Sequence, residues 1–314
     1  MTTVLGYSSP WAGVATFDAI RHFAWGIGDA NPLWLDEDYG MRSAWQGTIA
    51  PPSFLYASIN TAIAPDLDST RLSYSRVKWT WFDVVRLGSS IMSTGHSHKL
   101  HLKAKNPSQQ TLIEFTTSSG LLLAQLENDC LELEKHVQNQ MVVPRYSNQE
   151  IEEIELAILS ESRRGNTARY SETTIHGDTL GPLTKGPLSI VDLIAWSAGS
   201  TGYDIDVHPN SSTGLDASTA TAPQVIAWIC HLITDWMGDD SFLHHLDIEI
   251  FSVPHLGSTT VITGVVDRES ASHDERYTKI NIVAKYQDGS TVATGFALVL
   301  QPKSDQSKIY LPLK

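Results

Sequence analysis

The sequence is poor in the features that define several common protein classes. Cysteine occurs twice, at Cys130 and Cys230, far apart and in apolar stretches. Two distant cysteines make neither a disulfide framework nor a zinc site, so we expect buried free thiols and a reducing, cytoplasmic location. No apolar run reaches the length of a membrane span, and the chain does not open with a basic segment followed by an apolar one.

Several motifs of cofactor-dependent and hydrolytic enzymes are missing as well. The chain has no dinucleotide-binding glycine fingerprint, no phosphate-binding loop, no Gly-x-Ser-x-Gly elbow and no zinc signature. Redox cofactors, ATP and serine-hydrolase chemistry therefore have no support. We expect no cofactor, although an acyl carrier such as coenzyme A can arrive as part of the substrate.

Basic residues are in deficit. The chain has 22 Lys and Arg against 35 Asp and Glu, a net charge of −13. A nucleic-acid binder needs a basic surface, so the balance argues against that class. It is compatible with coenzyme A, whose phosphates need only a local basic patch.

Apolar and aromatic residues are plentiful by contrast. Hydrophobic residues make up 41% of the 314 residues, and nine residues are tryptophan. This length and composition are typical of a globular protein of two domains with a substantial core. Tryptophan either fills such a core, which is its commoner use, or lines a pocket for a flat apolar ligand.

Helix and strand patterns occur twice in the same order. We predict a first domain over 1–145, a connector over 146–168 and a second domain over 169–314. In the first domain the patterns predict a short helix and a long apolar helix that starts at a proline, and then strands, over residues 17–26, 47–64, 77–82, 89–96, 98–105, 111–117 and 121–134.

The connector and the second domain follow the same kinds of signal. Ser147 and Glu150 predict a capped helix in the connector. The second domain is predicted to hold a turn, a short helix, a long helix and four strands, over residues 177–181, 187–196, 223–237, 246–251, 259–266, 279–286 and 291–300. A long helix followed by antiparallel strands is an α+β pattern.

The segment 28–32 forms a tight polar turn between two apolar stretches. The carboxylate of Asp29 and the amide of Asn31 can point into one pocket there. Asp29 would act as a general acid or base, and Asn31 would hold a water or a carbonyl oxygen. The structural alternative is that Asp29 only caps the turn and Asn31 only stabilises it.

Gly47 and Thr48 precede the predicted long helix of the first domain. Backbone N–H groups at the start of a helix can stabilise a developing oxyanion, so both residues are candidates for that role. Simple N-capping by Thr48 fits equally well. A carboxylate base beside an oxyanion site suits proton transfer next to a thioester carbonyl.

The turn resembles a known family motif. MaoC-type acyl dehydratases and (R)-specific enoyl-CoA hydratases carry Gly-Asp-x-Asn-Pro-x-His, which this chain matches at Gly28, Asp29, Asn31 and Pro32, with Trp34 in place of histidine. The resemblance implies a double hotdog fold, in which each half wraps an antiparallel sheet around a long helix. The two halves would form an intramolecular pseudo-dimer, with a homodimer of chains also open.

The resemblance extends into the second half, where residues 185–188, 192–196 and 234–239 resemble a two-domain branch of the same family. No second Gly-Asp-x-Asn-Pro occurs there. The resemblance therefore implies one active cleft, with the second domain as its partner wall. We expect the carboxylates at 234–240 to serve the domain interface more than catalysis.

Substrate contacts are predicted on both walls of the cleft. Trp34 is either a platform for an apolar substrate or a packing residue that fills the space of the missing histidine. A histidine from the second half can replace the lost one. The candidates for substrate binding are Trp34, Pro52, Phe54, Tyr56, His208 and His231. The histidines at 96, 98 and 101 have no acidic or cysteine partner nearby, so we predict no metal site.

Three functions remain open. The first is a lyase that adds or removes water across the α,β bond of an acyl thioester or a related β-hydroxy carbonyl compound. The second is a cofactor-free isomerase or cyclase acting on a bulky, polyketide-like substrate in the same cleft. The third is a non-catalytic acyl-binding module. The substrate and the form of its acyl carrier stay open.

Overall fold

The computed structural model describes residues 13–59, 72–101, 107–132, 146–161, 168–200, 219–268, 276–304 and 311. In the first half the described strands are β1 (Leu72–Trp81), β2 (Ile91–His101), β3 (Ser108–Thr117) and β4 (Leu122–Glu132). In the second half they are β5 (Thr179–Lys185), β6 (Phe242–Ile250), β7 (Thr260–Asp267), β8 (Tyr277–Tyr286) and β9 (Thr291–Leu300).

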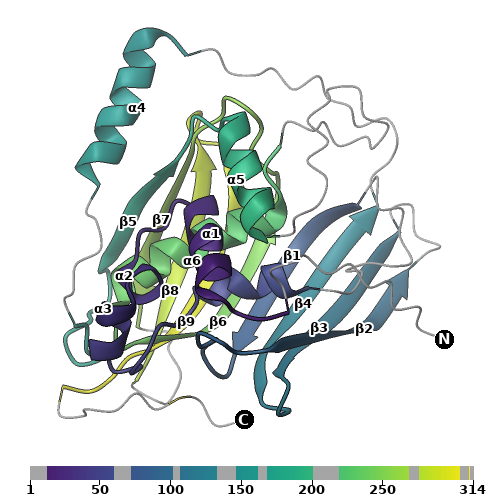
Figure 1. Cartoon of the computed structure of the whole chain (residues 1–314). Helices are drawn as coiled ribbons and strands as arrows, with labels where there is room; N and C mark the ends of the chain where they lie inside the picture. The colour runs from purple at the N-terminus through teal and green to yellow at the C-terminus, as the bar shows by residue number, and fades with distance from the viewer. Residues whose placement is uncertain are drawn as a thin grey trace.

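These strands form one continuous antiparallel sheet in the order β2-β3-β4-β1-β6-β9-β8-β7-β5 (Figure 1). The halves meet where β1 pairs with β6, with Val77 opposite Ile248. Arg76 and Asp247 reinforce the junction, because two guanidinium nitrogens each donate to a carboxylate oxygen at 2.7 Å. Pairing β1 with β6 removes an exposed edge from each half-sheet. The predicted double hotdog with a shared sheet is confirmed, and it makes the chain an intramolecular pseudo-dimer.

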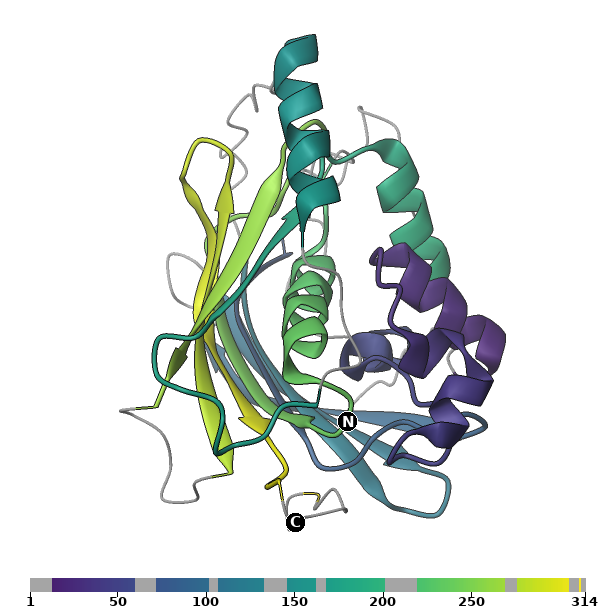
Figure 2. The same ribbon diagram turned by 90° about the vertical axis from the view of Figure 1, so that its left-hand side faces the viewer.

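The helices form two further layers on one side of this curved sheet (Figure 2). Helix α6 (Ala222–Met237) lies against the sheet, and helices α1 (Phe17–Gly26) and α5 (Ile190–Ser200) lie beyond it. Glycines allow α1 and α5 to approach closely: a Cβ on Gly26 would lie 2.7 Å from the carbonyl oxygen of Ala195. A Cβ on Gly199 would lie 2.5 Å from the carbonyl oxygen of His22. The first half is thereby joined to the second through helices as well as strands.

The long apolar helix predicted within 47–64 is wrong over its described part. Residues Pro52–Ser58 form a short 3₁₀ helix, η1, and Ile59 is extended. Every residue of η1 from Ser53 on is buried. An apolar run that is buried on all sides carries no 3.6-residue period, so the sequence could not set its length or hydrogen-bond pattern. The rest of the predicted helix lies outside the described residues.

Two strand predictions also need correction. The strands predicted at 89–96 and 98–105 are, over their described part, one strand, β2, with a register shift between Ser97 and Lys99. Residues 102–105 of the second prediction lie outside the described residues. Strand β5 was not predicted, because Gly177 and Gly181 suggested a turn; the chain turns at Gly177 and is already in β5 at Thr179. The other predicted strands and the helices at α1, α5 and α6 are present.

The hydrophobic core runs through both halves as one cluster. The predicted division into two domains and a connector stays a prediction. Cys130 and Cys230 are free and buried. Among the described residues, no helix is long and apolar enough to cross a membrane.

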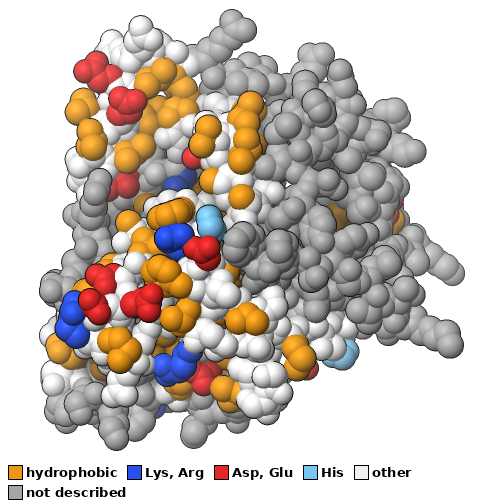
Figure 3. Space-filling view, in the orientation of Figure 1, with side chains coloured by type: hydrophobic (Ala, Val, Ile, Leu, Met, Phe, Trp, Pro, Cys, Tyr) orange, Lys and Arg blue, Asp and Glu red, His pale blue; other side chains and the backbone are white. Residues whose placement is uncertain are grey.

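The connector forms helix α4 (Asn148–Ser160), and the predicted capping box of Ser147 and Glu150 is present. No residue of α4 is buried. Figure 3 shows hydrophobic side chains gathered over α4 and α5 on one face of the molecule. The large exposed hydrophobic residues on these two helices are Ile151, Leu156, Ile158, Leu159, Ile190, Val191 and Ile194.

Candidate active site

Backbone geometry at the end of α1 fixes the position of Asp29. The N–H of Gly28 donates to Trp25 O at 3.0 Å, and the N–H of Asp29 donates to Ala24 O at 2.8 Å. Gly28 has a φ of 67°, the left-handed conformation that this helix end requires and that glycine adopts without strain. Asp29 therefore follows a rigid turn and not a free loop.

The side chains of Asp29 and Asn31 both bond to the backbone of the same turn. Asp29 Oδ1 accepts from the N–H of Asn31 at 2.9 Å, and Asn31 Oδ1 accepts from the N–H of Leu33 at 3.0 Å, capping the short helix α2 (Pro32–Leu35). Asp29 therefore caps the turn and Asn31 stabilises it, as the structural alternative predicted, and a further chemical role is left open. Asp29 Oδ2 and Asn31 Nδ2 are buried and have no partner among the described residues. Unpaired buried polar atoms are rare, and a bound substrate is one explanation for them.

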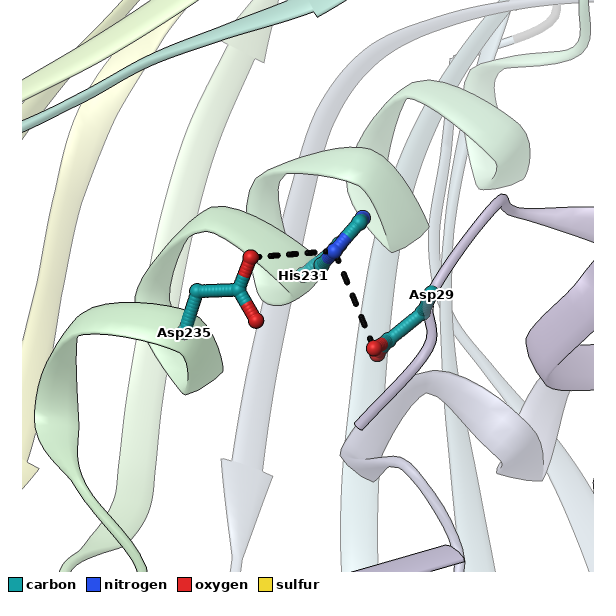
Figure 4. A group of neighbouring side chains, drawn as sticks. All are labelled: Asp29, His231 and Asp235. Carbon is teal, nitrogen blue, oxygen red and sulfur yellow. Dashed lines mark ion pairs between the residues drawn. The ribbon is translucent and has the colours of Figure 1, made fainter. Parts of the chain in front are cut away.

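An imidazole from the second half lies next to Asp29. His231 of α6 places its Nε2 3.7 Å from Asp29 Oδ1 and 3.1 Å from Asp235 Oδ2 (Figure 4). His231 and Asp235 are four residues apart and so lie on the same face of α6. The sequence named His231 as one of several histidines able to replace the one missing from the motif, and the structure brings it to the carboxylate.

Lys185 contacts the other side of this imidazole. At the end of β5, its Nζ lies 3.0 Å from His231 Nδ1 and donates to the carbonyl oxygen of Ile27 at 2.7 Å. A charged ammonium only donates hydrogen bonds, so Nδ1 accepts and the ring hydrogen sits on Nε2. That hydrogen faces the two carboxylates, which only accept when ionised. Each ring nitrogen of His231 therefore has a suitable partner: Nδ1 accepts from the ammonium, and the Nε2 hydrogen faces carboxylate acceptors.

Burial shifts the protonation of two of these groups. Burial raises the pKa of Asp29 above its ordinary value of 3.8, with His231 opposing the shift and Asp235 adding to it. Burial also lowers the pKa of Lys185 to about 8, although the charges of Asp29 and Asp235 oppose this. A carboxylate with a raised pKa is a stronger base, and a lysine with a lowered pKa is a stronger acid, which suits proton transfer near neutral pH.

The cluster can also be considered as a cation site. One ligand atom each from Asp29, His231 and Asp235 lie within 4.8 Å of one another. The ammonium of Lys185 already supplies a positive charge against these carboxylates, which weakens the electrostatic case for a second cation. Acid–base chemistry, which the shifted pKa values of Asp29 and Lys185 suit, is the better account of the cluster.

The oxyanion role predicted for Thr48 stays a prediction, whereas the geometry of Gly47 argues against the same role for that residue. The N–H of Gly47 donates to Gly40 O at 3.0 Å, so it is already engaged. Thr48 does not cap a helix, because Pro51 occupies the N-cap of η1 and no side chain bonds there. The prediction depended on a long α-helix that starts at Pro51, whereas the described part of this segment is the short 3₁₀ helix η1.

Trp34 lies beside an apolar pocket of about 470 Å³, its open mouth included. Trp34 is 1% exposed, and its Nε1 has no partner among the described residues. The acid–base residues Asp29, Lys185 and His231 are not among the residues that line the pocket. Residues lining the pocket include Trp34, Trp45, Pro52, Trp81, Met237 and Phe242.

Phe54 and Tyr56, predicted as substrate contacts, are core residues in the structure. Phe54 is fully buried with its ring edge-on to Phe23, and Tyr56 accepts a hydrogen bond from Trp79 Nε1 at 3.0 Å. Both come from η1, which packs against α5 and α6 of the second half as well as against α1 and β2. His208 lies outside the described residues.

Sequence reasoning missed Lys185 and Asp235 as site residues. The spacing of His231 and Asp235, one helical turn apart, was the available signal for Asp235. Lys185 had none, because its contacts are with residues far away in the chain. Of the carboxylates at the end of α6, Asp239 does serve the interface: the hydroxyl of Tyr39 donates to its side chain, and Trp45 Nε1 donates to its carbonyl oxygen at 2.8 Å.

Comparisons with known proteins agree with this fold. A family model described as the FAS1-like dehydratase domain region matches residues 4–114. The UPF0336 protein Franean1_6066 of Parafrankia sp. is 30% identical over 113 residues, which are 34% of this chain and 75% of that protein.

Three solved structures show the fold over nearly the whole chain. A MaoC-like dehydratase superposes with a TM-score of 0.68 at 13% identity, over 96% of this chain and 99% of the other. A MaoC-like dehydratase from Phytophthora capsici gives 0.60 at 11% identity, over 92% and 93%. RV0216 of Mycobacterium tuberculosis, described as a double hotdog, gives 0.53 at 9% identity, over 94% and 96%. By sequence and fold together, the chain belongs to the MaoC-like dehydratase family.

Proposed function

We propose that the protein is a hydro-lyase that adds or removes water across the α,β bond of an acyl thioester, with Asp29 and His231 as its acid–base pair. The observation that carries the proposal is the 3.7 Å separation between Asp29 Oδ1 and His231 Nε2. The motif histidine is replaced by tryptophan, and an imidazole from α6 stands next to the motif carboxylate. The family to which the chain belongs supports the reaction class.

The proton transfers follow from the two side chains. In dehydration the Asp29 carboxylate takes the proton from the carbon next to the thioester carbonyl. The hydroxyl on the β carbon leaves as water after receiving the Nε2 hydrogen of His231, and a carbon–carbon double bond forms. Hydration runs in reverse. The two unpaired buried atoms, Asp29 Oδ2 and Asn31 Nδ2, offer an acceptor and a donor to the hydroxyl and carbonyl of such a substrate.

The test is hydration of a short trans-2-enoyl-CoA, measured as the loss of the ultraviolet absorbance of the enoyl group. Asp29→Asn and His231→Gln should each lower kcat at least about 100-fold, the scale of a general acid–base group. The double variant should lose little more than either single variant, because the two residues act as a unit.

His176→Gln is the matched control. His176 is exposed and precedes the first residue of β5, whereas Lys185 is the last residue of that strand. It should behave as wild type. Hydration that survives both site variants within a few-fold would exclude this pair from the chemistry. Binding of the thioester without turnover in wild type would instead identify a binding module.

A second candidate function is favoured by the apolar pocket. Three tryptophans line it, and aromatic walls suit a bulky ligand such as a polyketide-like acyl chain. The same acid–base pair would then serve a cofactor-free isomerisation or cyclisation. Turnover of a bulky apolar substrate that requires Asp29, without hydration of the short enoyl-CoA, would establish this function over the first.

A further inference from the structure

The ammonium of Lys185 bridges the two halves at the site. It lies between the carbonyl oxygen of Ile27, at the end of α1, and Nδ1 of His231 on α6. The neighbouring Gly28 leaves room for it: a Cβ there would lie 3.3 Å from Nζ. The proton transfers proposed above involve His231 and Asp29 and assign no role to this buried cation.

A neutral imidazole has a single N–H hydrogen. If Nε2 of His231 gives that hydrogen to a leaving hydroxyl and nothing replaces it, the ring becomes an imidazolate anion. Imidazolate formation is unfavourable near neutral pH. The ring can stay neutral only if Nδ1 takes up a hydrogen as Nε2 releases one. The group within hydrogen-bond distance of Nδ1 is the ammonium of Lys185, at 3.0 Å.

We propose that Lys185 is a positioning and proton-loading residue for His231: it holds the imidazole hydrogen on Nε2 and passes a proton to Nδ1 as Nε2 releases its own. The loading step rests on the proposed function, whereas the positioning step does not. During dehydration an N–H bond breaks on Nζ and forms on Nδ1, and the Nε2 hydrogen joins the departing hydroxyl. Lys185 ends neutral and Asp29 ends protonated. The ring then carries its hydrogen on Nδ1. Transfer of the Asp29 proton to Nε2, and of the Nδ1 hydrogen back to Nζ, restores the resting state without net proton consumption.

The electrostatic surroundings of Lys185 suit this role. Its lowered pKa of about 8 makes it a far stronger acid than an exposed lysine. Four carboxylates face it and hold the pKa up against burial: Asp29 from the turn after α1, Asp235 from α6, Glu161 after α4 and Asp192 on α5. Because the protonated form is the loading form, turnover should fall as pH rises through about 8.

Nitrogen NMR on protein labelled with ¹⁵N-histidine tests the positioning step without any substrate. The signal of His231 is identified by its loss in His231→Gln. Wild type should show hydrogen on Nε2. Lys185→Met should weaken that preference, because only the two carboxylates then favour hydrogen on Nε2, whereas Lys185→Arg, which still donates to Nδ1, should keep it. Hydrogen on Nδ1 in wild type, or an unchanged preference in Lys185→Met, would overturn the proposal.

Hydration of the short enoyl-CoA tests the loading step. Lys185→Met should lower kcat at least about 100-fold with KM within a few-fold. Lys185→Arg should also have low kcat, because a guanidinium does not release its proton in this pH range, and the alkaline decline near pH 8 should disappear. Lys78→Met is the matched control, since Lys78 lies on β1 and pairs with Glu127 at 3.9 Å. A kcat within about threefold of wild type in folded Lys185→Met or Lys185→Arg overturns the loading step.

These measurements separate the two proposals. A wild-type protein that hydrates no thioester, yet carries an Nε2 hydrogen on His231 that is less populated in Lys185→Met, refutes the proposed function and supports the positioning step. A wild-type enzyme that requires Asp29 and His231, but is indifferent to Lys185 in both assays, refutes the role of Lys185 alone. Thermal melting of each variant confirms that it is folded.

Discussion

Replacing Asp29 by asparagine should separate activity from stability. Asparagine keeps the oxygen that accepts from the N–H of Asn31, so the turn and the cap on α2 should survive. Its amide cannot take a proton from a substrate. Turnover should therefore fall at least about 100-fold, which corresponds to about 2.7 kcal/mol of lost transition-state stabilisation.

The same substitution should not destabilise the protein at neutral pH. Burial raises the pKa of Asp29 above its ordinary value of 3.8. Between that value and the raised one, the folded state binds more protons than the unfolded state, so stability falls as pH rises through this window. Above the window the ionised carboxylate is a net cost to folding. Asparagine removes this cost, and Asp29→Asn should melt at the same or a higher temperature than wild type at pH 7.

The assay is thermal melting of both proteins from about pH 4 to about pH 8, with kcat measured on the short enoyl-CoA. The advantage of Asp29→Asn should shrink as pH falls through the window. Asp36→Asn is a suitable control, because Asp36 is exposed, caps α3 (Glu37–Arg42) and carries the same charge. A loss of stability at every pH, with kcat within a few-fold of wild type, would show that Asp29 is only a structural cap.

Three further predictions concern the pocket and the junction between the halves. Trp34→His should weaken binding of a bulky apolar acyl thioester by about 1–3 kcal/mol, measured by fluorescence titration, without raising hydration of the short enoyl-CoA; no change in either would place Trp34 away from the substrate. Gly199→Val should push α1 from α5 and lower the free energy of unfolding by about 1–3 kcal/mol in urea, whereas Gly13→Ala, which meets no atom within 4 Å, should not. Arg76→Met should lower the free energy of unfolding in urea by about 1–3 kcal/mol, because it leaves the largely buried Asp247 without its bidentate partner. The effect should stay in this range because Arg76 itself is 42% exposed. An unchanged denaturation midpoint would count against a role of this ion pair at the junction between the halves.

Much of the fold was predictable because its signals are local. Helices α1 and α6 have capping threonines and apolar faces, and most strands alternate between buried and partly exposed residues. The sequence pattern did not predict the correct element in two segments, where complete burial or turn-forming residues removed the usual periodicity. Segment η1 is apolar on every side and has no period. Strand β5 contains Gly181 and Pro182, which are typical of turns.

Only the site residues that are close together in the sequence were predictable. Asp29 and Asn31 belong to one short motif, so their proximity could be inferred from the sequence. His231 was one of several equivalent histidines, and nothing in the sequence says which of them reaches Asp29. Lys185 contacts His231 across 46 residues of sequence and Ile27 across 158. Contacts of that kind are set by the packing of the two halves and leave no spacing pattern.

The packing between the halves should therefore influence catalysis from a distance. Asp29 is fixed to the end of α1, and His231 is carried by α6 in the other half. Close packing of α1 on α5, permitted by Gly26 and Gly199, sets how the two halves meet. Misplacement of reacting groups by about 1 Å can cost about 100-fold in rate. A bulkier residue in the α1–α5 contact should thus lower kcat by more than its effect on stability suggests, although no atom of that contact belongs to the acid–base pair.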